Sequence, residues 1–141
     1  MPDFQVFELP EISKLLKVPF AKLKNWTNGR TGLVIEPSVR RAAGTGTRNL
    51  YSLDDVLLFA LAREFSGAGF AAKAVGKFLE AIRKNRNTLD QFAWITVWRP
   101  KPGGDFRIEE GHGRPEGAML VINVNVRDLV RGVNAKIEAA R

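Results

Sequence analysis

The chain has 141 residues but no cysteine and a single histidine, His112. Without cysteine it can form no disulfide bond, no thiolate nucleophile and no zinc site with cysteine ligands. His112 lies in the stretch GHGRPEG, where no acidic cluster accompanies it, so local spacing assembles neither a metal site nor a catalytic triad. We therefore predict that the protein is not an enzyme and that it holds no cofactor or metal.

Long hydrophobic runs are also missing. The longest apolar run near a predicted helix, VLLFALA, is far shorter than the about 20 residues that span a bilayer. The first ten residues, MPDFQVFELP, have no basic segment followed by an apolar one, so we expect no secretory leader. A hydrophobic content of 45% is nevertheless sufficient for one compact core, or for two small units that share one. These features predict a soluble, cytoplasmic protein without a membrane partner.

Acidic residues are scarce in one window of the sequence, residues 14–48. This window contains eight Lys or Arg residues and one acidic residue, Glu36, whereas the rest of the chain has fourteen of each sign. The formal net charge of +7 is therefore located in this window. A localised positive field attracts polyanions, so nucleic acid is the predicted partner and an anionic membrane surface is the competing one.

Two short helices joined by a tight turn are predicted for residues 9–28. In LPEISKLL, residues 9–16, the apolar positions recur at spacings of three and four. Pro19 then suits the first turn of a second helix, because its missing N–H would be unpaired there in any case. In this second helix we predict an apolar side formed by Phe20, Leu23 and Trp26 and an outward side formed by Lys22, Lys24 and Asn25. The pattern predicts a helix-turn-helix with a basic outer face and with Trp26 in the core.

A glycine-containing stretch follows the second helix and predicts a β-hairpin. NGRTG, residues 28–32, ends the helix, and strands are expected at residues 33–35 and 49–51. Basic residues lie along this hairpin, which makes it a wing. Ser52 and Asp55 then form a capping box at the start of a helix over residues 53–65, and a further helix is expected over residues 71–86.

The apolar period changes from about 3.6 to 2 in the last third of the chain. FAWITVWR, residues 92–99, is apolar on both faces, and DFRIEE and AMLVINVNV supply two further strands. Helical spacing returns after Arg127. We predict a three-stranded antiparallel meander followed by a C-terminal helix, with Trp94 and Trp98 in the sheet core or a dimer face rather than in an effector pocket. Because three strands leave apolar surface, this part should pack on the helices or on a second copy of the chain.

Four stretches of the sequence resemble the MerR family of transcription regulators. They are ISKLLKVPFAKLKNW, GLVIEPSVRR, RNLYSLDDV and GAGFAAKAV, which together cover roughly residues 7–86. The expected fold class is α+β: a MerR-like winged helix, with two further helices after the two-stranded wing, followed by the meander and the C-terminal helix. We expect a DNA-binding domain of residues 1–88 and a dimerisation or partner-binding element of residues 89–141. The long dimerising helix of the family has no counterpart after Arg86.

The resemblance also implies which residues meet DNA. They lie on the second helix and the wing, and are Lys22, Lys24, Asn25, Arg40, Arg41, Arg48 and Tyr51. Tyr51 takes the position of a family tyrosine that contacts phosphate. The chemistry of the others agrees, because asparagine can read the adenine edge, lysine can reach guanine, and wing arginines can enter the minor groove or hold phosphates.

Together these features predict a sequence-specific DNA-binding transcription regulator. It would act in the nucleoid as a homodimer on double-stranded DNA, would distort the promoter, and would have RNA polymerase as a candidate further partner. Two alternatives remain open. One is an architectural, excisionase-like or chromosome-segregation DNA-binding protein, and the other is a small-molecule-sensing module in the C-terminal half, for which no effector is specified.

Overall fold

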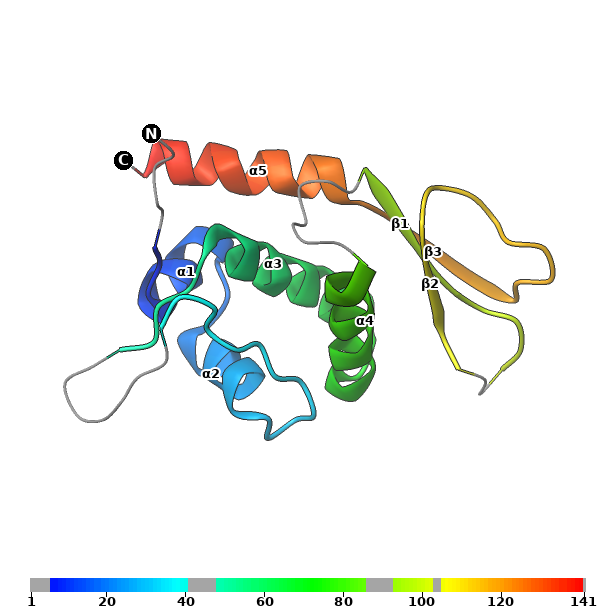
Figure 1. Ribbon diagram of the computed structural model, residues 1–141, viewed down its shortest axis with the longest axis horizontal. Coiled ribbons are helices and arrows are strands. Elements are labelled where there is room, and N and C mark those ends of the chain that lie inside the picture. The colour runs from blue at the N-terminus through cyan, green and yellow to red at the C-terminus, as the bar shows by residue number, and fades with distance from the viewer. Residues whose placement is uncertain (1–5, 41–47, 86–92, 103–104, 141) are drawn as a thin grey trace.

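The computed structural model describes residues 6–40, 48–85, 93–102 and 105–140 (Figure 1). The elements in these residues are α1 (Leu9–Leu16), α2 (Phe20–Asn28), α3 (Leu53–Gly67), α4 (Ala72–Asn85), β1 (Trp94–Arg99), β2 (Arg107–Glu110), β3 (Leu120–Asn125) and α5 (Val126–Ala139). In Figure 1 the first four helices lie together, α5 runs along α1 and α3, and the sheet lies beyond α4. Helices combined with one small antiparallel sheet are compatible with the predicted α+β class.

The turn between α1 and α2 forms where the sequence predicts it. Lys17 adopts a left-handed conformation with φ 55° and ψ 44°, and its N–H donates to the carbonyl of Ser13. The Ser13 hydroxyl also donates to the carbonyl of Val18 at 2.6 Å. Leu23 and Trp26 of α2 are buried, so the prediction that Trp26 belongs to the core is confirmed.

Phe20 is exposed, and its predicted place on the buried side of α2 is wrong. Its exposed fraction is 43%, against 0% for Leu23 and 4% for Trp26. Steps of three residues drift around a helix, because each residue turns it by about 100°. Phe20 is therefore about 120° away from Trp26, at the edge of a buried stripe centred between the other two residues.

The loop after α2 packs closely against α4 through two glycines. Gly29 ends α2 with φ 76°, and Gly32 has φ 94°. A Cβ built at Gly32 would lie 3.2 Å from Cβ of Lys73, and one built at Gly76 would lie 3.0 Å from the carbonyl oxygen of Gly32. Ala72 begins α4 just before this contact. The backbone of α4 and the backbone of this loop are thus in direct contact beside the end of α2, although they are distant in sequence.

The strand predicted at residues 33–35 is not present. Burial alternates along this segment, with Leu33 and Ile35 buried and Val34 exposed. The N–H of Ile35, however, donates to the carbonyl of Trp26 at 2.8 Å, so this backbone group bonds to α2 instead of to a partner strand. The hairpin pairs further along, in an antiparallel bridge between Arg40 and Leu50. The predicted tip of the wing lies outside the described residues.

The predicted meander order is wrong, because β1 and not β2 is the central strand. The order in the sheet is β2-β1-β3, with both neighbours antiparallel to β1. Four consecutive residues of β1 are buried, whereas β2 is a short strand that is mostly exposed. A strand that is apolar on both faces is stabilised most in the middle of a sheet, where both faces and both edges are covered.

The C-terminal elements pack on the helices, one of the two arrangements predicted for them. Ile95 and Val97 of β1 and Val133 and Ile137 of α5 belong to the same hydrophobic core as the buried residues of α1 to α4. Phe106 joins this core and makes edge-to-face contacts with Phe70 and Phe78, at centroid distances of 5.3 Å each. The predicted boundary between residues 88 and 89 lies outside the described residues, and the division into domains stays a prediction.

Candidate nucleic-acid interface

The exposed face of α2 carries cations and no carboxylate. Lys22 and Lys24 are exposed and Asn25 is half-buried, while the helix sequence FAKLKNWTN contains no acidic residue. The buried stripe of Leu23 and Trp26 holds the opposite side of the helix against the core. This arrangement keeps the polar face in solvent, where it can meet a polyanion.

Each lysine of α2 lies near an aromatic ring one turn away. The Nζ of Lys22 is 5.6 Å from the ring centroid of Trp26, and the Nζ of Lys24 is 5.6 Å from that of Phe20. These distances are within the range of a cation–π contact, which favours a defined position of the ammonium group. The two lysines therefore flank the face of α2 on different sides.

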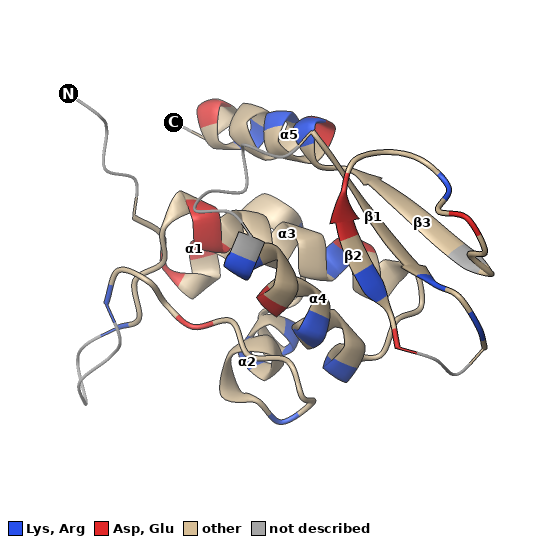
Figure 2. Cartoon of the chain, turned by 45° about the vertical axis from the view of Figure 1, so that its right-hand side comes forward, with Lys and Arg blue, Asp and Glu red and all other residues tan. Residues whose placement is uncertain are grey.

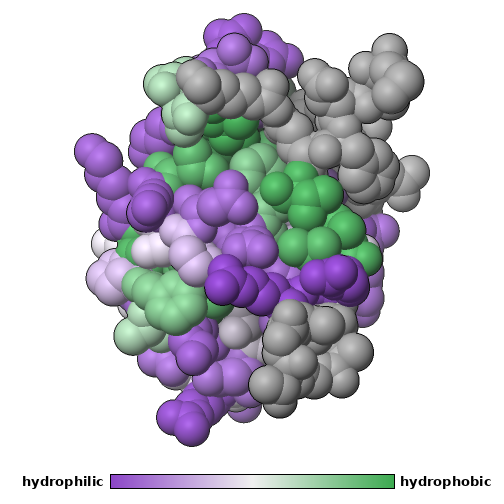
Figure 3. Space-filling view, turned by 90° about the vertical axis from the view of Figure 1, so that its left-hand side faces the viewer, coloured by the Kyte–Doolittle hydropathy of each residue, from purple (hydrophilic) through white to green (hydrophobic). Residues whose placement is uncertain are grey.

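The base of the wing brings Arg40 and Arg48 together. Arg40 Nη2 donates to the carbonyl of Arg48 at 3.3 Å, and Arg48 Nη1 forms an ion pair with Glu8 at 2.8 Å. The side that carries α1 and the base of the wing presents mostly hydrophilic residues, with separate hydrophobic areas between them (Figure 3). Both arginines are exposed, whereas Arg41 lies outside the described residues.

Tyr51 does not belong to this exposed surface. Its exposed fraction is 0%, and its ring packs edge to face on Phe59 with a centroid distance of 5.5 Å. The backbone of Tyr51 pairs with Phe7 in an antiparallel bridge, which directs the side chain inward. In this structure the side chain of Tyr51 is buried and cannot reach a phosphate, so the residue has a packing role.

Asp55 anchors the start of the wing to α3. This carboxylate is 1% exposed, and its Oδ2 accepts hydrogen bonds from the N–H of Ser38 at 2.9 Å, the hydroxyl of Ser38 at 2.6 Å and the N–H of Ser52 at 2.9 Å. The Ser52 hydroxyl accepts from the N–H of Asp55, so the predicted capping box is confirmed. One buried carboxylate thus fixes the helix start and the segment that leads to Arg40.

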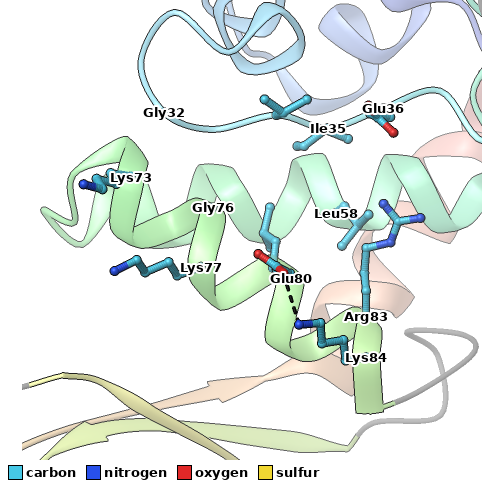
Figure 4. Close-up of a pocket in the computed structure, with 12 residues that line it drawn as sticks. Gly32, Ile35, Glu36, Leu58, Lys73, Gly76, Lys77, Glu80, Arg83 and Lys84 are labelled. Atoms are coloured by element: carbon cyan, nitrogen blue, oxygen red, sulfur yellow. Dashed lines mark ion pairs between the residues drawn. The ribbon is translucent and has the colours of Figure 1, made fainter.

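The structure adds a set of basic residues on α4 that the sequence reasoning missed. They are Lys73, Lys77, Arg83 and Lys84, and they line a groove of about 800 Å³ between α4 and the loop that follows α2. Lys84 pairs with Glu80 at 3.2 Å, and Lys73 and Lys77 project from α4 on one side, below the loop that carries Gly32 (Figure 4). The i, i+4 spacing of Lys73 and Lys77 was the available signal, but the balanced charge outside residues 14–48 concealed it.

In Figure 2 the cations of α2, of the loop after it and of the lower turns of α4 lie towards the same lower part of the molecule. The sheet at the other end has a different character. His112 packs against Trp94 in a tilted arrangement, with a centroid distance of 4.3 Å and an interplanar angle of 57°. Asn123 holds the adjoining loop by accepting from the Thr96 hydroxyl and the N–H of Gly113. His112 lies in the bend that follows β2. None of the helices in the described part of the chain is long and apolar enough to cross a membrane.

Comparison with known proteins finds distant relatives. No family model matches the chain. Its relatives include proteins described as uncharacterized HTH-type transcriptional regulators, one from Mycobacterium bovis and others from two strains of Mycobacterium tuberculosis. Each is 28% identical over 85 residues, which is 60% of this chain and 36% of the relative. The match thus covers about a third of the length of these curated relatives.

Proposed function

We propose that the chain is a helix-turn-helix DNA-binding transcription regulator with α2 as its recognition helix. The observation that carries this proposal is the division of α2 into a buried apolar stripe and an exposed basic face without a carboxylate. The printed names of the mycobacterial relatives support the same general class. A basic face on a short helix after a tight turn is the usual arrangement for entry into the major groove.

The residues of α2 divide into base-reading and positioning roles. Lys24 and Asn25 would face base edges, because lysine can donate to guanine and asparagine can both donate to and accept from adenine. Lys22, on the other flank beside Trp26, would contact the phosphate backbone. Phosphate contacts fix the register of the helix, and base contacts select the sequence.

The wing and α4 would extend the contact on either side of α2. Arg40, Arg41 and Arg48 would hold the backbone or enter a neighbouring minor groove, with Arg48 exchanging its exposed ion pair to Glu8 for a phosphate. Lys73 and Lys77 would meet the backbone beyond the loop at Gly32. Each such cation adds to the affinity for DNA, and its contribution decreases as the salt concentration rises.

We further propose a MerR-like mode of action. Two copies would place their α2 helices in successive major grooves, about 34 Å apart, and would bend or untwist the promoter between the half-sites. The protein would act in the nucleoid, with access of RNA polymerase as the regulated step. The resemblance of the four sequence stretches supports this mode, and the mass of the complex on one duplex, measured by light scattering, tests the homodimer.

The test of the function begins with selection of a duplex from a random library by the full chain. The selected duplex should bind at least about 10³-fold more tightly than random DNA at physiological salt. Lys24→Ala should weaken this preference, whereas Lys136→Ala, an exposed lysine on α5, should leave it unchanged. Equal affinity for selected and random duplexes would remove the regulator proposal. Genome-wide footprints at repeated sites away from promoters would support the architectural alternative instead.

A further inference from the structure

Phe20 is an aromatic residue left in water on the helix proposed to meet DNA. Among the described residues the other exposed large hydrophobic side chains are Val6, Val34, Val39 and Met119, none of which is aromatic. Full burial of a phenylalanine side chain removes a large apolar area from water and is strongly favourable. A partner that covers the exposed ring on α2 would therefore gain a large favourable contribution to the free energy of binding.

The position of Phe20 on α2 indicates that the group covering it is a base edge. It is the first residue of α2, and the N-terminal residues of a recognition helix are the ones that contact bases. Its ring lies one turn from Lys24, with the Nζ 5.6 Å from the ring centroid. The ring and the ammonium group thus form one small composite surface, apolar on one side and cationic on the other.

We infer that Phe20 is a specificity-determining residue that packs against the 5-methyl group of a thymine in the major groove, within two base-pair steps of a guanine contacted by Lys24. This inference rests on the proposed function. The thymine methyl is the apolar group that the major groove displays, and phenylalanine is among the side chains that contact it. Successive base pairs are about 3.4 Å apart, so the 5.6 Å separation of ring and Nζ matches groups one to two steps apart.

Deoxyuridine provides the cleanest probe, because it lacks the thymine methyl and keeps the same hydrogen-bonding edge. Loss of one buried methyl corresponds to about 0.8 kcal/mol, which is about a fourfold loss of affinity. Cytosine would be rejected more strongly, because it also replaces an acceptor by an amino donor. The proposal therefore predicts a methyl-dependent preference at one thymine in each half-site.

The experiment uses the full chain and the duplex selected from the random library. Dissociation constants are measured by fluorescence anisotropy for this duplex and for a series in which single thymines are replaced by deoxyuridine. The affinity of the unsubstituted protein should fall about fourfold when deoxyuridine replaces thymine at one position of each half-site. Phe20→Ala should bind the selected duplex more weakly and should no longer distinguish thymine from deoxyuridine. Met119→Ala, which truncates an exposed apolar side chain before β3, should keep the fourfold effect.

Two results would overturn the inference while leaving the proposed function intact. One is a Phe20→Ala protein that retains the fourfold deoxyuridine effect, and the other is an unsubstituted protein that prefers the selected duplex yet ignores every deoxyuridine replacement. If the alanine variant does not fold, Phe20→Leu takes its place. Leucine keeps a smaller apolar side chain, so the deoxyuridine effect should fall below fourfold, and an undiminished effect would overturn the inference. Failure to select any duplex would instead count against the proposed function itself.

Discussion

Gly76 in α4 and Gly132 in α5 lie inside helices but have opposite surroundings. A Cβ added at Gly76 would be 3.0 Å from the carbonyl oxygen of Gly32 and 3.5 Å from Cα of Leu33. A Cβ added at Gly132 meets no described atom within 4 Å. Alanine at each position therefore gives a matched pair, because the gain in helix propensity is shared and the contact with the loop after α2 is not.

The expected free energies of unfolding follow from these two contributions. Alanine in place of glycine inside a helix stabilises by about 0.5–1 kcal/mol, and Gly132→Ala should show this gain. At Gly76 the loop has little room to retreat, because Leu33 is 1% exposed and the N–H of Ile35 is bonded to the carbonyl of Trp26. Overpacking costs about 1–3 kcal/mol, so Gly76→Ala should be less stable than Gly132→Ala by about that amount.

Urea unfolding followed by far-UV circular dichroism measures both variants, with the m-value checked for constancy. DNA affinity provides a second measurement. Since the loop that Gly76 contacts leaves the end of α2, Gly76→Ala should also weaken binding to the selected duplex, and Gly132→Ala should not. If Gly76→Ala is stabilised as much as Gly132→Ala, the close approach of α4 to this loop does not constrain the protein, and the reasoning is refuted.

Three further predictions concern the proposed interface and its support. Asn25→Ala should cost about 1–3 kcal/mol on the selected duplex and relax its base preference, as measured by anisotropy, and an equal loss on random DNA would argue against base readout. The Arg40→Ala and Arg41→Ala double variant should reduce the slope of log K against log salt by about 0.9 per arginine in each subunit, and an unchanged slope would exclude the wing from the interface. Asp55→Ala should destabilise by about 2–4 kcal/mol in urea unfolding, because it leaves the bonded groups of Ser38 and the N–H of Ser52 without their acceptor. Asp55→Asn, which keeps one acceptor oxygen, should cost less, and unchanged stability of Asp55→Ala would contradict the anchoring role of this carboxylate.

Local signals were sufficient to predict the helices. The bounds of α1 agree with the residues predicted for it, and α2 begins directly after Pro19. The capping box of Ser52 and Asp55 marks the first residue of α3. These signals act within one or two turns of the chain, so neighbouring residues contain the information that specifies them.

The order of the strands and part of the site could not be predicted in this way. Three consecutive strands are compatible with several antiparallel orders, and the apolar character of both faces of β1 was the unused sign that it is central. Tyr51 shows the same limitation within the candidate site, since a resemblance assigned it to phosphate while packing on Phe59 buries it.

The sequence by itself determined where the helices of the helix-turn-helix begin and end and where the excess positive charge lies. It did so because capping, proline and apolar spacing are local, and because charge needs only counting. Only the tertiary structure decided that Asp55 fixes the wing base and that α4 brings Lys73 and Lys77 beside the loop after α2. These outcomes depend on contacts between residues tens of positions apart, such as that between Gly32 and Gly76, which no local pattern contains.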